Sequence, residues 1–335
     1  SKSLIEMDRL MGRFLPEGAF DPAETGAHSR QRIFTAHNTF WGFLSQVLST
    51  DSGCVEVVRK VQAAASCKKR SLPSSNTSAY CQARKKLDAD TLHETLVYTS
   101  RQADHISSEP EMFQRRTVVV DGTGFSMPDT PENQSVWPQS REQKPGCGFP
   151  TAKVAALFSL HTGALLSYAC GNKHDQEINL FRSQWNQLRE GDILLGDKGF
   201  NNYRDVAMLR NQGVDTLMNL RRKPFKSTEI IRSLGEDDWL VRWNRPQRIK
   251  SFSPEEWQAL PSSMVVRMIR IQVDVPGFRS QEIYLVTTLS DAAEYPADEL
   301  RDLYLRRWDV ELFYRDIKET MGMDVLRCKT PEMIV

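Results

Sequence analysis

Two aspartates stand at the ends of apolar stretches that are typical of buried strands. Asp121 ends the run Thr-Val-Val-Val-Asp, Asp197 ends the run Asp-Ile-Leu-Leu-Gly-Asp, and glycine follows each within two residues. Because ligands bind beyond the carboxyl ends of parallel strands, we expect the two carboxylates to meet around metal ions. Mg²⁺ prefers carboxylates and water, and two ions about 4 Å apart can activate an attacking oxygen and stabilise a leaving one. An aspartate before glycine is also a common turn former, which is the alternative for either position alone.

A third acid stands on a predicted carboxy-terminal helix. The residues that fall within roughly a 60° arc of that helix, at about 100° per residue, are Tyr304, Arg307, Glu311 and Lys318, with Arg315 close beside them. This stripe offers an acid for metal binding, with cations and a hydroxyl group that could hold phosphates. The i,i+4 spacing of Arg307, Glu311 and Arg315 also suits ion pairs, so a solvent-facing stripe is the alternative.

The stretches around the aspartates read as three strands, a helix, a strand, a helix and a strand. They are residues 117–121, 154–160, 164–169, 177–188, 192–197, 203–212 and 214–220. This order predicts an α/β fold, a ribonuclease-H-like mixed sheet covered by helices. The long helix is expected from about 297 to 321, with Pro296 suited to its first turn.

Four segments are predicted along the chain. They are an all-helical amino-terminal domain over residues 1–112, the first part of the catalytic core over 113–220, a β-rich insertion over 221–290, and the final core helix over 291–335. The helical prediction depends on apolar spacing in 39–48 and 76–87. The insertion is predicted from a basic run at 221–226 and from alternating strands, 265–273 and 282–288, around a Pro276-Gly277 turn.

Basic residues gather in the amino-terminal segment, where they could form a surface that faces phosphates, and a solvated helix face is the alternative. They are Arg59, Lys60, Lys68, Lys69, Arg70, Arg84, Lys85 and Lys86. Tyr80, Arg84 and Lys85, which lie in the segment 76–87, are candidates for a helix that enters a DNA groove, and a packed helix with an exposed basic side is the alternative. Lys198, beside the second aspartate, is a further candidate for phosphate binding.

The overall composition leaves the partner open. Lys and Arg total 44 against 43 Asp and Glu, so only the local distribution of charge could mark a nucleic-acid surface. Six cysteines without a Cys-x-x-Cys pair and six histidines without a His-x-x-x-His spacing predict reduced thiols in a cytoplasmic protein. The sequence lacks the apolar run of about 18 residues that spans a bilayer, so no membrane partner is expected.

The spacing Tyr304-x-x-Arg307-x-x-x-Glu311-x-x-x-x-x-x-Lys318 resembles the Tyr-Arg-Glu-Lys signature of the insertion-sequence-four family of bacterial transposases. The segments Asp121-Gly-Thr-Gly-Phe-Ser, Gln143-Lys-Pro-Gly-Cys-Gly-Phe and Gly196-Asp-Lys-Gly-Phe also resemble that family's aspartate regions, so the similarity covers most of residues 115–325.

The resemblance implies a DNA transposase that cuts the ends of its element and joins them to target DNA. Asp121, Asp197 and Glu311 would be the metal ligands for two Mg²⁺ ions, or Mn²⁺ in their place, and Tyr304, Arg307 and Lys318 would contact terminal phosphates. The implied partners are double-stranded DNA, as inverted-repeat ends and target, and a second protomer in a paired-end homodimer. The implied location is the bacterial nucleoid. In some members a tryptophan of the insertion receives a flipped base. The candidates here are Trp239, Trp243 and Trp257, and core or surface packing is the alternative for each.

Two other functions remain open. One is a ribonuclease-H-like nuclease that cuts DNA without joining it, and the other is a DNA-binding regulator that has lost catalysis. His174 could also approach the site from the segment before the helix at 177–188, although a cap or a surface residue is the simpler interpretation.

Overall fold

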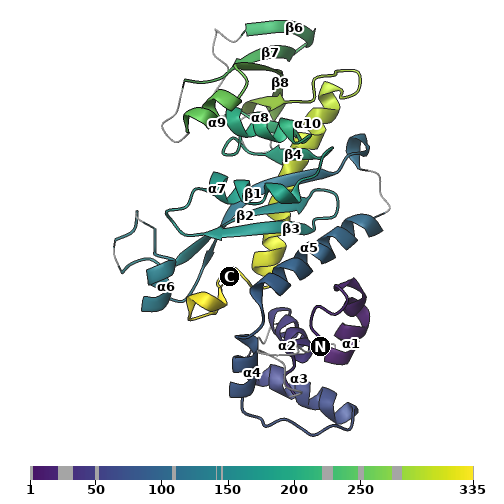
Figure 1. The fold of residues 1–335 in the computed structure, drawn as a ribbon, viewed down its shortest axis with the longest axis vertical. Coiled ribbons are helices and arrows are strands. Elements are labelled where there is room, and N and C mark those ends of the chain that lie inside the picture. The colour runs from purple at the N-terminus through teal and green to yellow at the C-terminus, as the bar shows by residue number, and fades with distance from the viewer. Residues whose placement is uncertain are drawn as a thin grey trace. The chain divides into compact units, whose positions relative to one another are not determined.

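The computed structural model describes residues 3–21, 33–49, 53–107, 111–140, 142–144, 146–220, 229–247, 253–273 and 281–334. Its strands are β1 (Thr117–Ser126), β2 (Thr151–Ser159), β3 (Leu165–Gly171), β4 (Ile193–Gly196), β5 (Asp215–Asn219), β6 (Glu229–Gly235), β7 (Asp238–Asn244), β8 (Ser263–Val273) and β9 (Gln281–Thr287) (Figure 1). The chain is thus a mixed α/β protein. The basic run at 221–226 and the Pro276-Gly277 turn lie outside the described residues.

The α-helices are α1 (Leu4–Met11), α2 (Ala36–Val47), α3 (Cys54–Cys67), α4 (Ser78–Arg84), α5 (Ala89–Ile106), α6 (Pro131–Val136), α7 (Glu177–Arg182), α8 (Tyr203–Asn211), α9 (Pro254–Ala259), α10 (Ala297–Leu305) and α11 (Asp309–Arg315). The shorter helical turns are η1 (Gly12–Phe14), η2 (Met112–Gln114), η3 (Trp185–Gln187), η4 (Arg306–Trp308), η5 (Asp316–Thr320) and η6 (Pro331–Met333).

The described strands form one sheet in the order β3-β2-β1-β4-β5-β9-β8-β7-β6. β1, β4 and β5 run parallel to one another, whereas β2 pairs with β3, and β5 with β9, in antiparallel fashion. The strands predicted around the two aspartates are therefore confirmed as elements of one mixed sheet. The segment predicted as a β-rich insertion contains β6 to β9, which continue this same sheet, and β6, β7 and α9 were not predicted.

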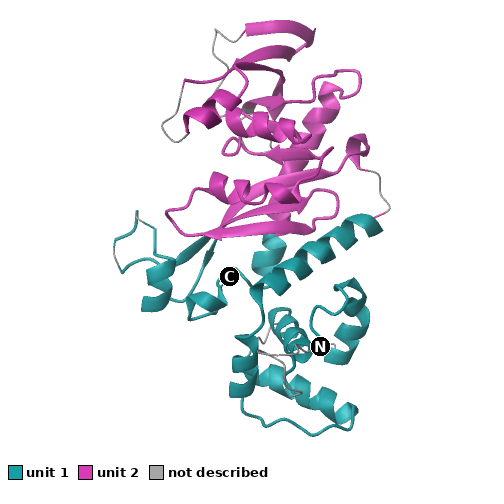
Figure 2. Cartoon of the chain, in the orientation of Figure 1, with its two compact units in different colours: residues 1–106, 124–152, 314–335 teal, residues 107–123, 153–313 magenta. Residues whose placement is uncertain are grey.

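The chain divides into two compact units (Figure 2). One unit comprises residues 1–106, 124–152 and 314–335, and the other comprises 107–123 and 153–313. The first unit contains α1 to α5, whose core includes Phe40, Trp41, Val57 and Tyr80. A capping box between Ser3 and Glu6 begins α1, and the Thr35 side chain accepts a hydrogen bond from the Asn38 amide at the start of α2.

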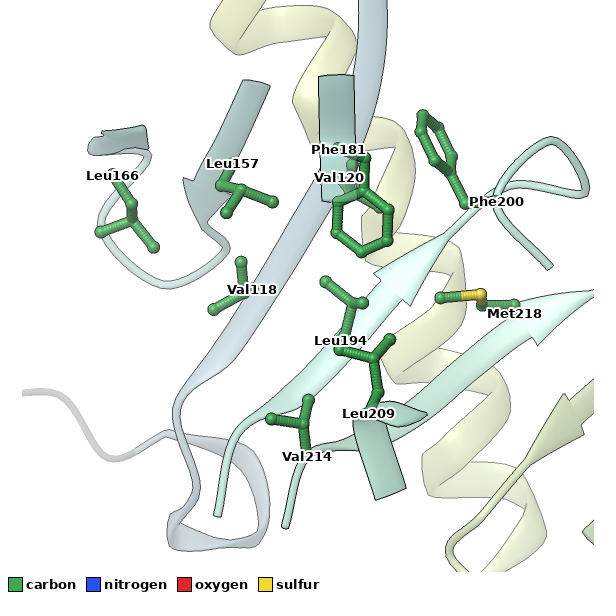
Figure 3. Close-up of a cluster of buried hydrophobic side chains, with 10 residues drawn as sticks. All are labelled: Val118, Val120, Leu157, Leu166, Phe181, Leu194, Phe200, Leu209, Val214 and Met218. Atoms are coloured by element: carbon green, nitrogen blue, oxygen red, sulfur yellow. The ribbon is translucent and has the colours of Figure 1, made fainter. Parts of the chain in front are cut away.

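In the second unit, alternation along the strands assigns side chains to the two faces of the sheet. Val118 and Val120 of β1 pack with Leu194 of β4, Phe181 of α7 and Leu209 of α8 on one face (Figure 3). The intervening residue Val119 therefore points to the opposite face. On that second face Phe158 of β2 contacts Phe313 of α11, with ring centroids 5.6 Å apart. α7 and α8 thus cover one face, and the carboxy-terminal helical stretch contributes to the other.

Candidate active site

Asp121 and Asp197 occupy equivalent places beside two parallel strands. Val119 of β1 is the register partner of Leu195 of β4, and each aspartate stands two residues after that pair in the sequence. The alternation of side chains along β1 places the Asp121 carboxylate on the face that carries Val119, opposite α7 and α8. Asp197 is close enough for its charge to act on the pKa of Asp121. Asp197 follows β4 directly, as predicted. The prediction that Asp121 ends its strand is wrong, because β1 continues to Ser126 after its pairing with β4 has stopped.

The environment of Asp121 favours its protonated form. Burial raises the pKa of the Asp121 carboxyl, and the nearby charges of Asp197 and Glu177 raise it further. The Gly122 amide, which donates to Asp121 Oδ1 at 2.9 Å, and the Arg307 guanidinium act against this rise in the pKa. Asp121 therefore lies within electrostatic range of two other carboxylates and one cation.

Glu177 is a part of this site that the sequence prediction missed. A Cβ atom on Gly122 would lie 2.8 Å from the Glu177 carboxylate, so the absence of a side chain at this position makes room for that group. Glu177 is the first residue of α7. The neighbouring candidate His174 is exposed, and its amide donates to Asn172 Oδ1 in a local turn.

The predicted helix at 297–321 is present, but it departs twice from α-helical pitch. α10 passes into the 3₁₀ turn η4 (Arg306–Trp308), then into α11, and finally into the π-helical turn η5 (Asp316–Thr320). The narrow stripe predicted at about 100° per residue assumed one regular α-helix. Tighter and wider turns alter the angle between successive side chains, so the stripe is not kept as a single line.

Tyr304 and Arg307 form one contact group on this helical stretch. Tyr304 is 1% exposed, and burial raises the pKa of its hydroxyl against the effect of a hydrogen bond with Arg307. The Arg307 guanidinium carbon lies 5.7 Å from the centroid of the Tyr304 ring and 5.3 Å from that of Trp308. Its Nε atom is buried and finds no hydrogen-bond partner among the described residues. Arg307 therefore retains a donor for an anion.

Glu311 is exposed on α11, one turn after Arg307. In the described part of the chain, no group of three or more His, Cys, Asp or Glu side chains is close enough to hold a metal ion. Neither Glu177 nor Glu311 therefore completes a three-ligand group with the two aspartates in this structure. The donors nevertheless suit a divalent ion, because carboxylate oxygens are what Mg²⁺ prefers and a cation would relieve the repulsion around Asp121.

The remaining residues of the stripe belong to the other compact unit. Arg315 is exposed at the end of α11, and Lys318 lies on the π-helical turn. The Lys318 ammonium nitrogen is 5.2 Å from the centroid of the Phe125 ring, near the end of β1. The Phe125 ring thus holds the ammonium group of Lys318 by a cation–π contact within this unit.

The predicted DNA-contacting residues of α4 differ in exposure. Tyr80 is completely buried in the helical core, where its hydroxyl donates to Gln46 Oε1 at 2.6 Å. Arg84 donates to the same oxygen at 3.1 Å and is partly buried, whereas Lys85, which follows α4, is exposed. Lys198 in the other unit is exposed too. In this conformation Tyr80 packs in the core. Among these four residues, Arg84, Lys85 and Lys198 have cationic groups that a ligand could contact.

The three candidate tryptophans of the insertion are partly buried and pack against one hydrophobic cluster around α8, β7 and β8. Trp243 contacts Tyr203 edge to face at 5.6 Å, and the Arg245 guanidinium carbon lies 5.0 Å from the centroid of the Trp257 ring. All three tryptophans thus take part in the packing of the insertion, and none of them stands out as a site for a flipped base.

Among the described residues, no helix has the length and apolar character needed to cross a membrane.

The sequence also matches known proteins. A sequence model of the family described as "Transposase DDE domain" matches residues 112–335, a range that contains Asp121, Asp197 and Glu311. The chain is 26% identical over 259 residues to "Transposase InsG for insertion sequence element IS4" from Escherichia coli (strain K12). The similar region covers 77% of this chain and 57% of that protein, so the chain spans less than two thirds of the relative that it matches.

Proposed function

The chain belongs to the transposase DDE domain family, and on that premise we propose that it cleaves the ends of a DNA element and joins them to target DNA. The observation that carries this proposal is the register of β1 and β4, which sets Asp121 and Asp197 two residues after paired positions of two parallel strands. The strand order β3-β2-β1-β4-β5, with β1, β4 and β5 parallel, supports a ribonuclease-H-like core.

We propose that Asp121, Asp197 and Glu311 hold divalent cations, two Mg²⁺ ions or Mn²⁺ in their place. When bound, such ions stabilise the attacking and leaving oxygens of a phosphodiester. The chain supplies the placement of the carboxylates, with Asp121 and Asp197 fixed by hydrogen bonds from the Gly122 and Gly199 amides. Since Glu311 lies on a separate helical stretch, its approach to the aspartates would complete the site.

The proposed reaction begins with attack of water on a phosphodiester at the element end, which breaks the bond to the 3′ oxygen and frees a 3′-hydroxyl. That hydroxyl then attacks a phosphodiester of the target, so that one ester bond is exchanged for another. Arg307 would bind a phosphate through its unpaired Nε, while Tyr304 and Trp308 fix the plane of its guanidinium. Arg315, Lys318 and Lys198 are the further proposed phosphate contacts.

We also propose double-stranded DNA as the partner, bound as paired inverted-repeat ends by two protomers in the cytoplasm. The amino-terminal helices would contribute Arg84 and Lys85 to this interface, with Tyr80 as the buried support of α4. The proposed order of segments is a helical DNA-binding domain at 1–112, a catalytic core at 113–220 and 291–335, and an insertion at 221–290.

Two other candidates would use the same fold. A catalytically inactive DNA-binding regulator would bind DNA without using the acids for chemistry. A nuclease of the same fold would need the metal group but not the joining step. These candidates predict different products from the same DNA.

The test is to incubate the chain with Mg²⁺ or Mn²⁺, labelled DNA that carries the element's own inverted repeats, and a supercoiled target plasmid. A transposase yields labelled 3′ ends that become joined to the plasmid. Cleavage without joined product would favour the nuclease, and binding without cleavage would favour the regulator. A chain lacking all three activities would contradict the proposal.

A further inference from the structure

Two cysteine thiols lie side by side in the helical part of the first compact unit. Cys54 is the first residue of α3, and Cys81 stands in α4. The Cys81 thiol donates to Cys54 Sγ across 3.7 Å. A disulfide requires about 2.0 Å between the sulfurs, so the two sulfurs would have to approach each other by less than the length of two covalent bonds.

The surroundings of the pair keep it in place. Gln46 of α2 donates from Nε2 to Cys54 Sγ at 3.6 Å, and its Oε1 accepts hydrogen bonds from Tyr80 and Arg84 of α4. Both cysteines are partly buried against the same hydrophobic cluster. α2, α3 and α4 therefore fix the two sulfurs near each other, and each thiol remains partly exposed to a small oxidant.

We propose that Cys54 and Cys81 form a modification site, where hydrogen peroxide converts the two thiols to an intramolecular disulfide. The proposal depends on the spacing of the sulfurs and is independent of the proposed action on DNA. It also revises the expectation that all six cysteines stay reduced. In a reducing cytoplasm this pair would be in the thiol form, and exposure to peroxide would oxidise it.

The reaction balances with peroxide as the only oxidant. One thiol loses its proton, and its sulfur attacks a peroxide oxygen, which breaks the O–O bond and gives a sulfenic acid and one water. The second sulfur then attacks the first, the S–S bond forms, the S–O bond breaks, and a second water leaves with the remaining thiol proton. Two thiols are oxidised by two electrons, and one peroxide is reduced to two waters.

Burial and the hydrogen bond to Cys54 raise the pKa of the Cys81 thiol, against the lowering effect of the nearby positive charges of Arg84 and Lys85. The thiolate of Cys81 is therefore scarce at neutral pH, and oxidation of the pair should proceed faster as the pH rises. The product would link α3 to α4 and close the chain between residues 54 and 81 into a loop. Such a loop restricts the unfolded chain and raises the melting temperature.

The test uses a chain in which the two exposed cysteines are removed as Cys67→Ser and Cys147→Ser, so that links between molecules are suppressed. After treatment with hydrogen peroxide, free thiols are titrated in denaturant. The masses of the digested peptides are then measured by mass spectrometry before and after reduction. We expect the loss of two thiols, one linked peptide pair containing Cys54 and Cys81, and a mass lower by two hydrogen atoms.

Two controls separate this site from general oxidation. Adding Cys81→Ser should abolish the linked peptide and the rise in melting temperature, and dithiothreitol should reverse both in the parent chain. If that variant fails to fold, the peptide map of the parent chain still decides the question. Cys54 and Cys81 that remain as free thiols, or that carry separate sulfinic acids without a linked peptide, would overturn the proposal.

Discussion

The carboxylate of Glu177 lies against the α-carbon of Gly122, where an added Cβ would be 2.8 Å away. Gly122 immediately follows Asp121 on β1, whereas Glu177 begins α7. This contact brings a third negative charge close to the pair of aspartates, and that charge contributes to the raised pKa of Asp121. A glycine and a glutamate from distant parts of the sequence thus set the electrostatic environment of one carboxylate.

Gly122→Ala should lower the pKa of Asp121. The new methyl group would push the flexible Glu177 carboxylate away at small steric cost, and a negative charge near Asp121 would be lost. Glu177→Gln should shift the pKa in the same direction. The measurement is a pH titration of ¹³C-labelled aspartate carboxyl resonances in metal-free buffer, with the Asp121 signal identified by its loss in Asp121→Asn.

Gly124→Ala is the matched control for this titration. Its Cβ would meet Thr151 Cγ2 at 3.4 Å, an ordinary contact that involves no charge. The Asp121 titration should therefore stay as in the unmodified chain. An unchanged titration in both Gly122→Ala and Glu177→Gln would show that Glu177 does not act on Asp121.

Asp121→Asn should stabilise the metal-free chain at neutral pH. Because the pKa of Asp121 is raised in the folded state, its contribution to stability is present below about pH 4, the value of an unfolded aspartate, and is lost as pH rises through the raised pKa. Asparagine does not ionise, so the Asp121→Asn variant does not lose this stability as the pH rises. Thermal unfolding in EDTA should show a gain in melting temperature that grows with pH.

Asp205→Asn provides the opposite case. Asp205 is 1% exposed and accepts from Arg182 Nε at 3.0 Å, so its charge is compensated. Replacing it should leave Arg182 without its partner and lower the melting temperature. A loss of stability in Asp121→Asn comparable to that in Asp205→Asn would contradict the view that Asp121 is an electrostatically unfavourable position.

The sequence could predict features that depend on local periodicity. Apolar runs located the strands that carry Asp121 and Asp197, and helical spacing located the stretch from Ala297 onward. The contact between Glu177 and Gly122 had no local signal, because it depends on how α7 packs against the sheet. The change of pitch around Arg307 and Lys318 was equally hidden, since both lie within an unbroken helical pattern.

The arrangement of the insertion and the burial of Tyr80 on α4 depend on contacts between residues that are distant in the sequence, so local patterns did not predict them. β6 has mostly exposed residues on both faces, so it lacks the alternation that reveals a strand. The position of β8 and β9 within the central sheet depends on pairing between β5 and β9, which composition cannot specify. Tyr80 was placed on a possible DNA-binding face, but its burial reflects packing among α2, α3 and α4.

Arg307→Gln should weaken DNA binding and lower its dependence on salt. If Arg307 pairs with one phosphate, the slope of log Kd against log salt concentration should fall by about one. Fluorescence anisotropy with a labelled duplex at several salt concentrations measures this slope. Arg306→Gln is the control, because Arg306 is exposed and is paired with Asp309 at 3.8 Å. Equal effects of the two substitutions would argue against a specific phosphate contact at Arg307.

Arg267→Met should destabilise the insertion and the start of α10. Arg267 is completely buried, pairs with Asp238 through hydrogen bonds of 2.8 and 2.6 Å, and donates to the Tyr295 carbonyl at 2.6 Å. Its removal would leave Asp238 buried without a partner, at a cost of about 3–5 kcal/mol in the free energy of unfolding. Urea denaturation measures the change.

Arg270→Met is the comparison for that substitution. Arg270 also stands on β8 and pairs with Asp237, but both side chains are substantially exposed. Its loss should therefore produce a much smaller change than that of Arg267. Similar denaturation midpoints for the two variants would mean that the buried pair does not hold β7, β8 and Tyr295 together.

We propose that Glu311 acts with Asp121 and Asp197 as one acidic triad. The most direct test of this proposal is the single-turnover rate of 3′-end cleavage, with saturating Mn²⁺ and labelled inverted-repeat DNA, in Glu311→Gln and in Glu319→Gln. Both glutamates are exposed on the same helical stretch. We predict that Glu311→Gln loses at least about 100-fold in rate, with DNA binding and melting temperature retained, while Glu319→Gln cleaves as the unmodified chain does. Undiminished cleavage by Glu311→Gln would contradict the account.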